Sequence, residues 1–317
     1  MAQPSNTYDS YDNVNSIKED IQDIIYNISP DEVPFMSKSQ KTTAKSTLHE
    51  WSTDTLRSSA LNAHIEGDDS VATAVAGVTR LNNRTQIFKD AIVISDTDEG
   101  LSKIAKAKEM SYQILKAGKA MKLDIEKALF DNNAKVTGSS TAARELAGAP
   151  TWLTSNTVAG SGGSDATGDG TDARTDGTQA AFTQANFDTV MQGIWENGGT
   201  GIKSCYLSAF QMNKALAFTG NNNQRANVVG ADERVINSVS IYLTPFGEVS
   251  FTPSRENRSR DVFIMQDDTW QVATLRPMRN VELAKTGDNS KRQLTTELTL
   301  VCKSEAANGM VADCTTS

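Results

Sequence analysis

The chain has 317 residues, which is enough for one large or two modest domains. Hydrophobic residues make up 38% of it and the mean hydropathy is −0.42, both low for a compact enzyme of this length. The net charge of −8 argues against a dedicated nucleic-acid binder with a concentrated basic patch, and the apolar runs are too short for a transmembrane helix. We therefore expect long arms or loops whose apolar groups are buried only against neighbouring subunits.

Residues 1–46 form a polar N-terminal arm that is mostly acidic up to Glu32. Pro34, Phe35 and Met36 present apolar groups there with no local core. Five isoleucines at helical spacing predict a short amphipathic helix closed by Ser29 and Pro30: Ile17, Ile21, Ile24, Ile25 and Ile28. The pattern indicates an arm that docks on another surface, and a disordered tail is the alternative.

Residues 47–96 indicate an extended loop in the form of a two-stranded β-ribbon. β-formers line one face of the outgoing segment, and the returning segment runs over residues 83–96, with small and polar residues between them at 57–81. An isolated two-stranded ribbon is marginal in water, so this one would gain stability by lying across a neighbouring molecule. The candidate subunit-interface residues of the arm and ribbon are Phe35, Trp51, Arg57, Glu66, Arg80 and Arg84.

One long helix is predicted from Asp98 to Asn133. Apolar residues recur at three- and four-residue steps from Leu101 to Leu129, which gives a single narrow stripe along its whole length. At 1.5 Å per residue the helix would be roughly 50 Å long and would need a long, flat partner. Gly118 lies near its middle, where glycine costs about 1 kcal/mol relative to alanine. Close packing against a sheet is one explanation for this glycine, and a bend point in the helix is the other.

Residues 97–180, which begin with this helix, also contain a low-complexity stretch of Gly, Ser, Thr and Asp at 154–178. Val158 is its only sizeable apolar residue, so the stretch predicts a surface loop or a flexible insertion. Its aspartates match neither the EF-hand spacing nor the glycine-rich nonapeptide pattern of calcium sites. We therefore predict a solvated loop without a metal.

Residues 181–280 predict a denser globular region. A helix is expected around residues 187–195, with Thr183 as its N-cap and the Asn197-Gly198-Gly199 run as its stop. Ser208 and Gln211 predict a capping box for a second, short helix that ends near Gly220. Strands are expected at 202–207, 239–243, 249–252, 262–266 and 270–275, and residues 267–269 are predicted to form a hairpin turn between the last two.

Residues 281–317 contain a clean strand of period two from Leu294 to Cys302. Helices combined with mostly antiparallel strands, without a βαβ rhythm, indicate the α+β class.

The residue types that carry enzyme chemistry form no recognisable site in the sequence. The only two histidines, His49 and His64, lie in the predicted ribbon, and no nucleotide-binding glycine pattern joins a strand to a helix. Three cysteines lie far apart without metal-ligand spacing, and Cys205 and Cys302 are expected to be inert core thiols. The cluster of Arg255, Arg258 and Arg260 favours a salt-bridging loop over a phosphate site. We predict no catalytic residue, no cofactor and no metal, and hence no enzyme.

The order of these parts resembles the major capsid protein of tailed bacteriophages, which has the Johnson fold. The specific local likeness lies in residues 235–310 and is to a capsid family related to that of the elongated-head podophages. The segments that carry it are Thr244-Pro245-Phe246-Gly247, Leu275-Arg276-Pro277, Leu283-Ala284-Lys285-Thr286-Gly287-Asp288, Lys291-Arg292 and Glu305-Ala306-Ala307.

The resemblance implies a subunit that assembles into hexamers and pentamers and forms an icosahedral or prolate shell around double-stranded DNA. Residues 47–96 would be the extended loop, and residues 97–180 the peripheral domain with its spine helix. Residues 181–280 would be the axial domain, and residues 281–317 would return to the peripheral domain. Gly118 would be a bend point as an immature shell expands.

The resemblance also implies the partners of the chain. The subunit would be a homo-oligomer that meets portal, scaffold and decoration proteins and encloses DNA without specific binding. It would be assembled in the bacterial host cytoplasm, reside in the virion and meet no membrane. The lack of lysine between Lys45 and Lys89 disfavours covalent cross-links between subunits. The alternatives are another phage structural subunit, such as a tail-tube or decoration protein, and an enzyme with an unrecognised site.

Overall fold

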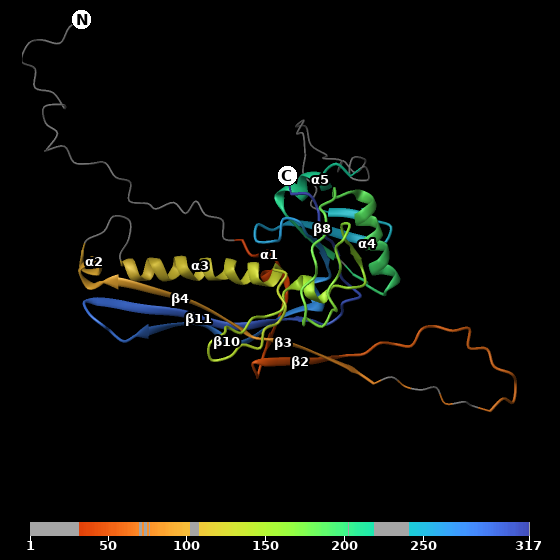
Figure 1. Ribbon diagram of the computed structural model, residues 1–317, viewed down its shortest axis with the longest axis horizontal. Helices are drawn as coiled ribbons and strands as arrows, with labels where there is room; N and C mark the ends of the chain where they lie inside the picture. The colour runs from red at the N-terminus through yellow and green to blue at the C-terminus, as the bar shows by residue number, and fades with distance from the viewer. Residues whose placement is uncertain are drawn as a thin grey trace, which may run out of the picture.

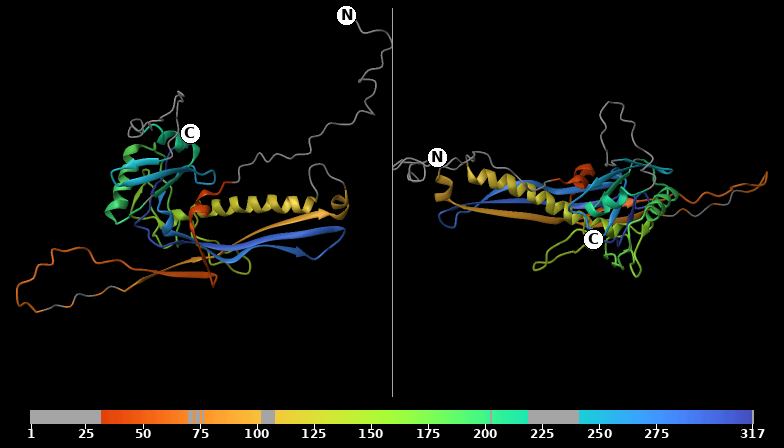
Figure 2. Two further views of the ribbon diagram at one scale, coloured as in Figure 1. Left: turned by 180° about the vertical axis from the view of Figure 1, so that it is seen from behind. Right: turned by 90° about the horizontal axis from the view of Figure 1, so that it is seen from above.

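The computed structural model describes residues 32–69, 72, 75, 77–101, 108–201, 203–218 and 241–316, and these form an elongated α+β subunit (Figure 1). A long four-stranded sheet under one helix forms one part, and a six-stranded sheet with two helices forms a compact part at one end of it. A two-stranded ribbon leads into a long loop that projects away from both (Figure 2). The α+β class is confirmed.

The elements of the described residues have the following bounds. The helices are α1 (Pro34–Lys38), α2 (Asp96–Gly100), α3 (Glu109–Phe130), α4 (Gln184–Glu196) and α5 (Ala209–Ala215), with 3-10 turns η1 (Ala149–Trp152) and η2 (Asp267–Thr269). The strands are β1 (Gln40–Thr43), β2 (Leu48–Thr53), β3 (Thr79–Arg84), β4 (Gln86–Ser95), β5 (Thr157–Val158), β6 (Lys203–Leu207), β7 (Ile241–Thr244), β8 (Gly247–Pro253), β9 (Val262–Met265), β10 (Trp270–Leu283), β11 (Asn289–Cys302) and β12 (Gly309–Val311).

The four-stranded sheet has the order β1-β10-β11-β4, with β11 antiparallel to both β10 and β4. α3 lies along one of its faces (Figure 1). Strand alternation buries Phe88 and Ile94 of β4, while Ile87 and Val93 are exposed. The predicted apolar stripe of the helix is confirmed within α3, where the buried apolar members are Met110, Ala117, Met121, Ile125 and Leu129.

The prediction of one continuous helix from 98 to 133 is wrong in its first third. α3 begins at Glu109, because Lys108 has extended backbone angles of φ −145° and ψ 133°. α2 is a separate short helix, capped by Ser95, whose Oγ accepts from the Asp98 amide at 3.1 Å. Gly100, a poor helix former, is its last residue, and Leu101 is already extended. The 22 residues of α3 span roughly 33 Å.

The six-stranded sheet has the order β5-β12-β9-β6-β8-β7 and a hydrophobic core of its own under α4. The predictions for α4 are confirmed at both ends. Thr183 Oγ1 accepts from the Asn186 amide at 3.3 Å, and Gly198 after the helix has φ +88°, a conformation that glycine adopts without strain.

Two local predictions in this part of the chain are wrong. Ser208 and Gln211 do not form a capping box, since the Ser208 hydroxyl donates to the Ser259 carbonyl and the Gln211 amide donates to the Thr315 carbonyl. Residues 267–269 are not a hairpin turn, because β9 belongs to the six-stranded sheet and β10 to the four-stranded one. Asp267 instead accepts hydrogen bonds from Tyr206, at 2.7 Å, and from Ser204, at 2.6 Å, where the chain crosses between sheets.

The low-complexity stretch at 154–178 is a folded part of the subunit, so its prediction as a solvated loop is wrong. β5 pairs with β12, and the backbones of Ser164 and Thr175 pair with each other. Gly170 has φ +74°, and a Cβ there would lie 2.9 Å from the Trp152 ring. Arg174 is buried. These turns and close contacts could not be predicted from the composition of the stretch, because its residues are mostly small and polar.

The Pro34-Phe35-Met36 segment docks on its own subunit as α1. Phe35 is fully buried, with its ring 4.9 Å from Phe130, 5.4 Å from Tyr206 and 5.9 Å from Trp270 between centroids. The prediction that these apolar groups lack a core of the same chain is therefore wrong. Residues 1–31, with the predicted amphipathic helix, lie outside the described residues.

The sheets also change where the parts of the chain divide. β10 extends to Leu283 in the four-stranded sheet, although residues up to 280 were assigned to the globular region. β12, within the last segment, belongs to the six-stranded sheet, so residues 281–317 contribute to both parts. The division into peripheral and axial domains stays a prediction.

Candidate functional site: an exposed loop, its anchor and an ionic junction

The loop of residues 54–78, between β2 and β3, exposes apolar side chains that the described part of the subunit does not cover. Leu56 and Leu61 are 98% and 101% exposed, and Ile65, Val75 and Val78 are exposed as well. Single exposed apolar residues are ordinary, but five in one projecting loop indicate a surface that a partner covers. The interval was predicted to be polar, and its isolated Leu and Ile residues were the signal that this prediction overlooked.

The base of the ribbon is held by buried polar contacts. The Asn83 side chain in β3 donates to the carbonyl of Leu300 at 2.8 Å and accepts from the amide of Ala147 at 2.9 Å. Beside it, Lys135 Nζ donates to the carbonyls of Asn82 and Asp169 at 3.0 and 2.8 Å. Such contacts are directional, so they fix the course of the ribbon where it leaves the sheet.

Glu297 on β11 is a second anchor at the same place. Its buried carboxylate accepts from Thr85, between β3 and β4, and from Arg276, at 2.7 Å each, and it also pairs with Arg144. Burial acts to raise the pKa of Glu297, but the hydrogen bonds from Thr85 and Arg276 and the charges of both arginines outweigh it, so the pKa lies below its ordinary value. The charged carboxylate of Glu297 therefore joins β11 to three other segments, those of Thr85, Arg144 and Arg276.

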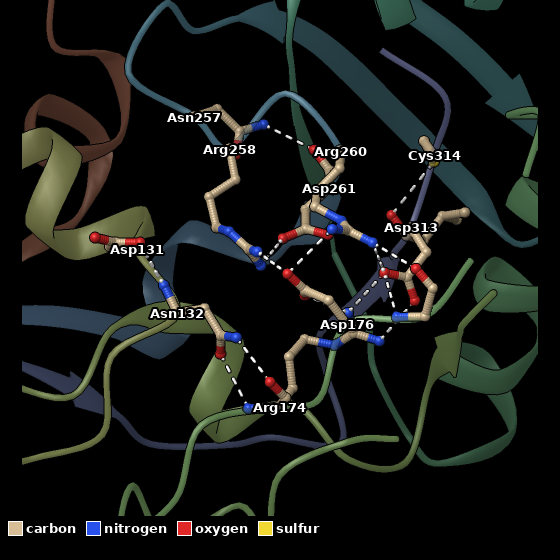
Figure 3. Close-up of polar contacts among 12 residues, drawn as sticks. Asp131, Asn132, Arg174, Asp176, Asn257, Arg258, Arg260, Asp261, Asp313 and Cys314 are labelled. Carbon is tan, nitrogen blue, oxygen red and sulfur yellow. Dashed lines mark hydrogen bonds and ion pairs between the residues drawn. The ribbon is translucent and has the colours of Figure 1, made fainter. Parts of the chain in front are cut away.

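A cluster of three arginines and four aspartates lies beside the six-stranded sheet, and its buried members are Arg174, Asp261 and Asp313 (Figure 3). We call it the ionic junction. It ties the 154–178 stretch to the loop before β9 and to the C-terminal segment. Its members are Arg174, Arg258, Arg260, Asp165, Asp176, Asp261 and Asp313.

Asp313 is the centre of the ionic junction. Arg174 binds its carboxylate with both terminal nitrogens, at 3.3 and 3.2 Å, and both side chains are fully buried. Arg260 donates to the same carboxylate at 2.6 Å, and the amides of Gly160 and Gly177 donate at 3.1 and 3.0 Å. Burial acts to raise the pKa of Asp313, but these hydrogen bonds, with Arg174 foremost, bring it below its ordinary value.

Arg258 and Arg260, two of the three arginines in the loop before β9, form salt bridges, as predicted. Asp176 bridges Arg258 and Arg260 at 2.7 and 3.1 Å, and Arg258 also pairs with Asp261 at 2.6 Å. Burial acts to lower the pKa of Arg258, yet Asp261 and Asp176 raise it overall. Since the guanidinium groups are engaged by carboxylates of the same chain, the ionic junction is a clamp between segments rather than a phosphate site.

Groups suited to other chemistry are not brought together in the described residues. No cluster of three or more His, Cys, Asp or Glu that could hold a metal ion occurs among them. None of their helices is both long and apolar enough to cross a membrane. Cys205, Cys302 and Cys314 are buried and unpaired, and burial raises the pKa of the Cys314 thiol to about 12.

The sequence matches the family described as SU10 major capsid protein over residues 3–315. This chain belongs to that family. The major capsid protein of Escherichia phage Phieco32 is 33% identical over 136 residues, which are 43% of this chain and 38% of that protein. The matched part thus spans less than half the length of this relative.

Solved phage capsids have the same fold as this capsid-family subunit. The capsid asymmetric unit of cyanophage A-1(L) is similar with a TM-score of 0.66 and 12% identity, over 95% of this chain and 98% of that one. The asymmetric unit of the mature capsid of bacteriophage PhiM1 is similar with a TM-score of 0.60 and 11% identity, over 98% and 96%. The resemblance to tailed-phage capsid proteins is confirmed, while the likeness to elongated-head phages stays a prediction.

The candidate interface residues of this capsid subunit fall into three groups. Phe35 is fully buried in the subunit's own core, so its assignment to a subunit interface is wrong. Arg57 and Glu66 lie in the exposed loop. Trp51 is half-buried, and its ring centroid lies 5.3 Å from that of Trp152.

The last two candidates lie on β3 at the base of the loop. Arg80 is exposed and lies 3.9 Å from Glu50, and Arg84 is half-buried. Contacts of Trp51, Arg57, Glu66, Arg80 and Arg84 with another subunit stay predictions.

Gly118 lies on the half-buried flank of α3. A Cβ at this position would have no atom within 4 Å, so close packing does not explain the glycine and that interpretation is wrong. The bend-point hypothesis stays a prediction.

Proposed function

We propose that this subunit assembles with copies of itself into hexamers and pentamers, which form the icosahedral or prolate head shell of a tailed phage around double-stranded DNA. The observation that carries the proposal is the loop of residues 54–78. It presents apolar side chains that its own subunit leaves uncovered, on a ribbon whose base is fixed. In a shell of identical chains, each copy offers a surface that can cover the loop of the next.

The contact between one loop and the neighbouring subunit is repeated at every subunit of the shell, so its total free energy is large. Burying a Leu, Ile or Val side chain contributes about 1.5–3 kcal/mol, before the costs of association are subtracted. Five such side chains in each loop therefore give every subunit a substantial share of the contact energy. Many individually weak contacts then sum to a stable container.

The remaining parts of the proposal follow from charge and from the missing chemistry. A net charge of −8 disfavours tight contacts with phosphates, so the shell would enclose DNA without specific binding. The role is structural rather than enzymatic. Portal, scaffold and decoration proteins are the further partners that a head shell requires.

The proposal is tested on the purified full chain by size-exclusion chromatography with light scattering and by negative-stain microscopy. We expect capsomers, shells or tubes. A monomer at all protein and salt concentrations, with the ribbon folded, would contradict it.

A double variant tests the loop itself. Leu61→Ser with Ile65→Ser should leave the subunit folded and reduce assembly, because it removes apolar contact area only. Asn62→Ser with His64→Ser is the matched control in the same loop and should assemble normally. Equal assembly of both variants would show that the apolar side chains are not the contact.

A further inference from the structure

The side of α3 that faces away from the four-stranded sheet meets α1 at its C-terminal end. There, α1 packs on Phe130 through Phe35 and donates its first amides to Glu126, from Phe35 and Met36, at 2.8 Å each. At steps of three and four residues the same side of α3 continues beyond α1, and we call this continuation the outer stripe. It consists of Lys122, Lys119, Leu115 and Tyr112 of α3 and of Lys108, the extended residue just before the helix.

The outer stripe is basic and has an apolar centre. Leu115 is 72% exposed, and the three lysines are exposed around it. Lys116 adds a further exposed cation on the flank, and no position of the stripe carries a carboxylate. Gly118 leaves the neighbouring backbone open, since a Cβ there would meet no atom within 4 Å. Such a surface suits a partner that is apolar on one face and acidic beside it.

We propose that residues 15–29 of the same chain bind the outer stripe as an amphipathic helix. This helix would continue the interface that α1 already makes with α3. The segment has isoleucines on one helical face and Glu19, Asp20 and Asp23 near them, against one cation, Lys18. Its apolar face would cover Leu115 and the lysine stems, and its carboxylates would pair with the lysine heads.

The chain connection and the lengths fit this arrangement. The chain enters α1 at Pro34, next to Glu126, so the residues just before it begin at the covered end of the stripe. Residues 30–33 can reach roughly 13 Å, and one helical turn from Glu126 to Lys122 is about 6 Å. A helix over residues 15–29 is roughly 22 Å long, and the stripe from 108 to 122 measures roughly 21 Å.

The geometry also fixes direction and register. The helix would run in the same chain direction as α3, with Ile28 near Lys122 and Ile21 over Leu115. Glu19, Asp20 and Asp23 would then lie beside the lysines in the middle of α3. A segment tethered four residues away has an effective concentration in the millimolar range, which favours its own α3 over that of another copy.

A cysteine pair tests the proposal in the full chain. Ile21→Cys with Leu115→Cys should form a disulfide within one chain under mild oxidation, read as a faster band on a non-reducing denaturing gel and as a linked peptide by mass spectrometry. The native cysteines are buried and do not compete. The control pair, Ile21→Cys with Val281→Cys on the exposed edge of β10, should react about tenfold more slowly, because nothing holds its thiols together.

Two outcomes would overturn the proposal. One is no disulfide in the first pair although both thiols react with a maleimide. The other is a disulfide only between chains when the two single variants are mixed, which would assign the stripe to a second copy. The band is scored within single chains, so the result does not depend on whether shells form.

Charge reversal tests the pairing of the two segments. Lys116→Glu with Lys122→Glu should slow the intrachain disulfide about tenfold, and adding Glu19→Lys, Asp20→Lys and Asp23→Lys should restore it. Lys89→Glu, exposed on β4 rather than on α3, is the control and should have no effect. An unchanged rate in the reversed variant would contradict the electrostatic part of the proposal.

Discussion

Single polar residues hold this subunit together at points where distant segments meet. Asp313 joins the C-terminal segment to Arg174 and Arg260, and Glu297 joins β11 to the base of the ribbon. Glu126 holds the first turn of α1 on α3 through two backbone amides. Polar residues of these types are usually exposed, so no pattern in the sequence marked them as buried.

The ionic junction should be sensitive to the loss of one partner. We expect Asp313→Ala to lower the free energy of unfolding by about 3–5 kcal/mol, because it removes the buried carboxylate that binds the fully buried Arg174 with two hydrogen bonds. Denaturant unfolding followed by tryptophan fluorescence measures this. Glu282→Ala, which breaks the exposed pair with Arg292, is the control and should cost less than about 1 kcal/mol. Equal losses in both variants would show that the junction is not a clamp.

Glu297 should give the subunit part of its sensitivity to acid. Its pKa is lower in the folded state than in the unfolded state, so its contribution is fully present above the unfolded pKa, about 4.3, and is lost as the pH falls through the folded pKa. Glu297→Gln should therefore be less stable than the unchanged chain at pH 7 and lose less stability between pH 5 and pH 3. Unfolding curves across this range measure the difference. Parallel pH profiles of the two proteins would contradict the assignment.

At the scale of elements, periodic patterns in the sequence predicted the helices and strands that depend on interactions between residues close together in the chain. The apolar stripe of α3, the caps of α4 and the strand at 294–302 within β11 are confirmed, because each depends on neighbours along the chain. Burial does not alternate along that strand, since both of its faces are buried from Thr296 to Cys302. The break before Glu109 was not predicted, because the apolar spacing continues through it. The crossing at residues 267–269 was missed for another reason. Two strands separated by a short turn resemble a hairpin unless the sheets they join are known.

Gly118 provides a test of helix stiffness. Gly118→Ala should stabilise the subunit by about 0.5–1 kcal/mol, since alanine is the better helix former and its Cβ would meet open space. If the glycine is a bend point, shells of this variant should also expand more slowly, which light scattering and microscopy of immature shells would follow. Shells of Gly118→Ala that expand at the normal rate, from a more stable subunit, would contradict the bend-point hypothesis. A destabilised variant would mean that the space around Gly118 is filled in the assembled state.

At the scale of the whole molecule, the loop of residues 54–78 projects from two packed sheets and does not pack against either of them. One hydrophobic core is shared by the two sheets, a second lies between the six-stranded sheet and α4, and η2 links β9 of one sheet to β10 of the other. The loop of residues 54–78 has no such core, which explains how a chain with only 38% hydrophobic residues still builds two compact parts. The sequence predicted the loop of residues 54–78 and its position in the chain. Composition alone did not predict that the 154–178 stretch is folded onto the subunit. Both the 54–78 loop and the 154–178 stretch have few apolar residues. Only the 154–178 stretch is held to the rest of the subunit by a buried arginine, Arg174.

Shortening this loop separates folding from assembly. Residues 55–77 should be deleted and Asp54 joined to Val78 through Asn-Gly, a two-residue hairpin turn that continues the pairing of Thr53 with Thr79. A deletion up to residue 81 would also remove Leu81, which packs on the core from β3. The shortened subunit should unfold at the same or a slightly higher temperature, since a shorter loop costs less entropy to close.

The same shortened subunit should fail to form stable shells, because it lacks four of the five exposed apolar side chains that a neighbour would cover. Thermal unfolding and light scattering of one preparation measure both properties. A second variant, in which a Gly-Ser linker of equal length replaces residues 55–77, keeps the reach of the loop and removes its side chains. Loss of shells in both variants would assign the contact to the side chains. Normal shells from the shortened chain would show that the loop is not an assembly contact.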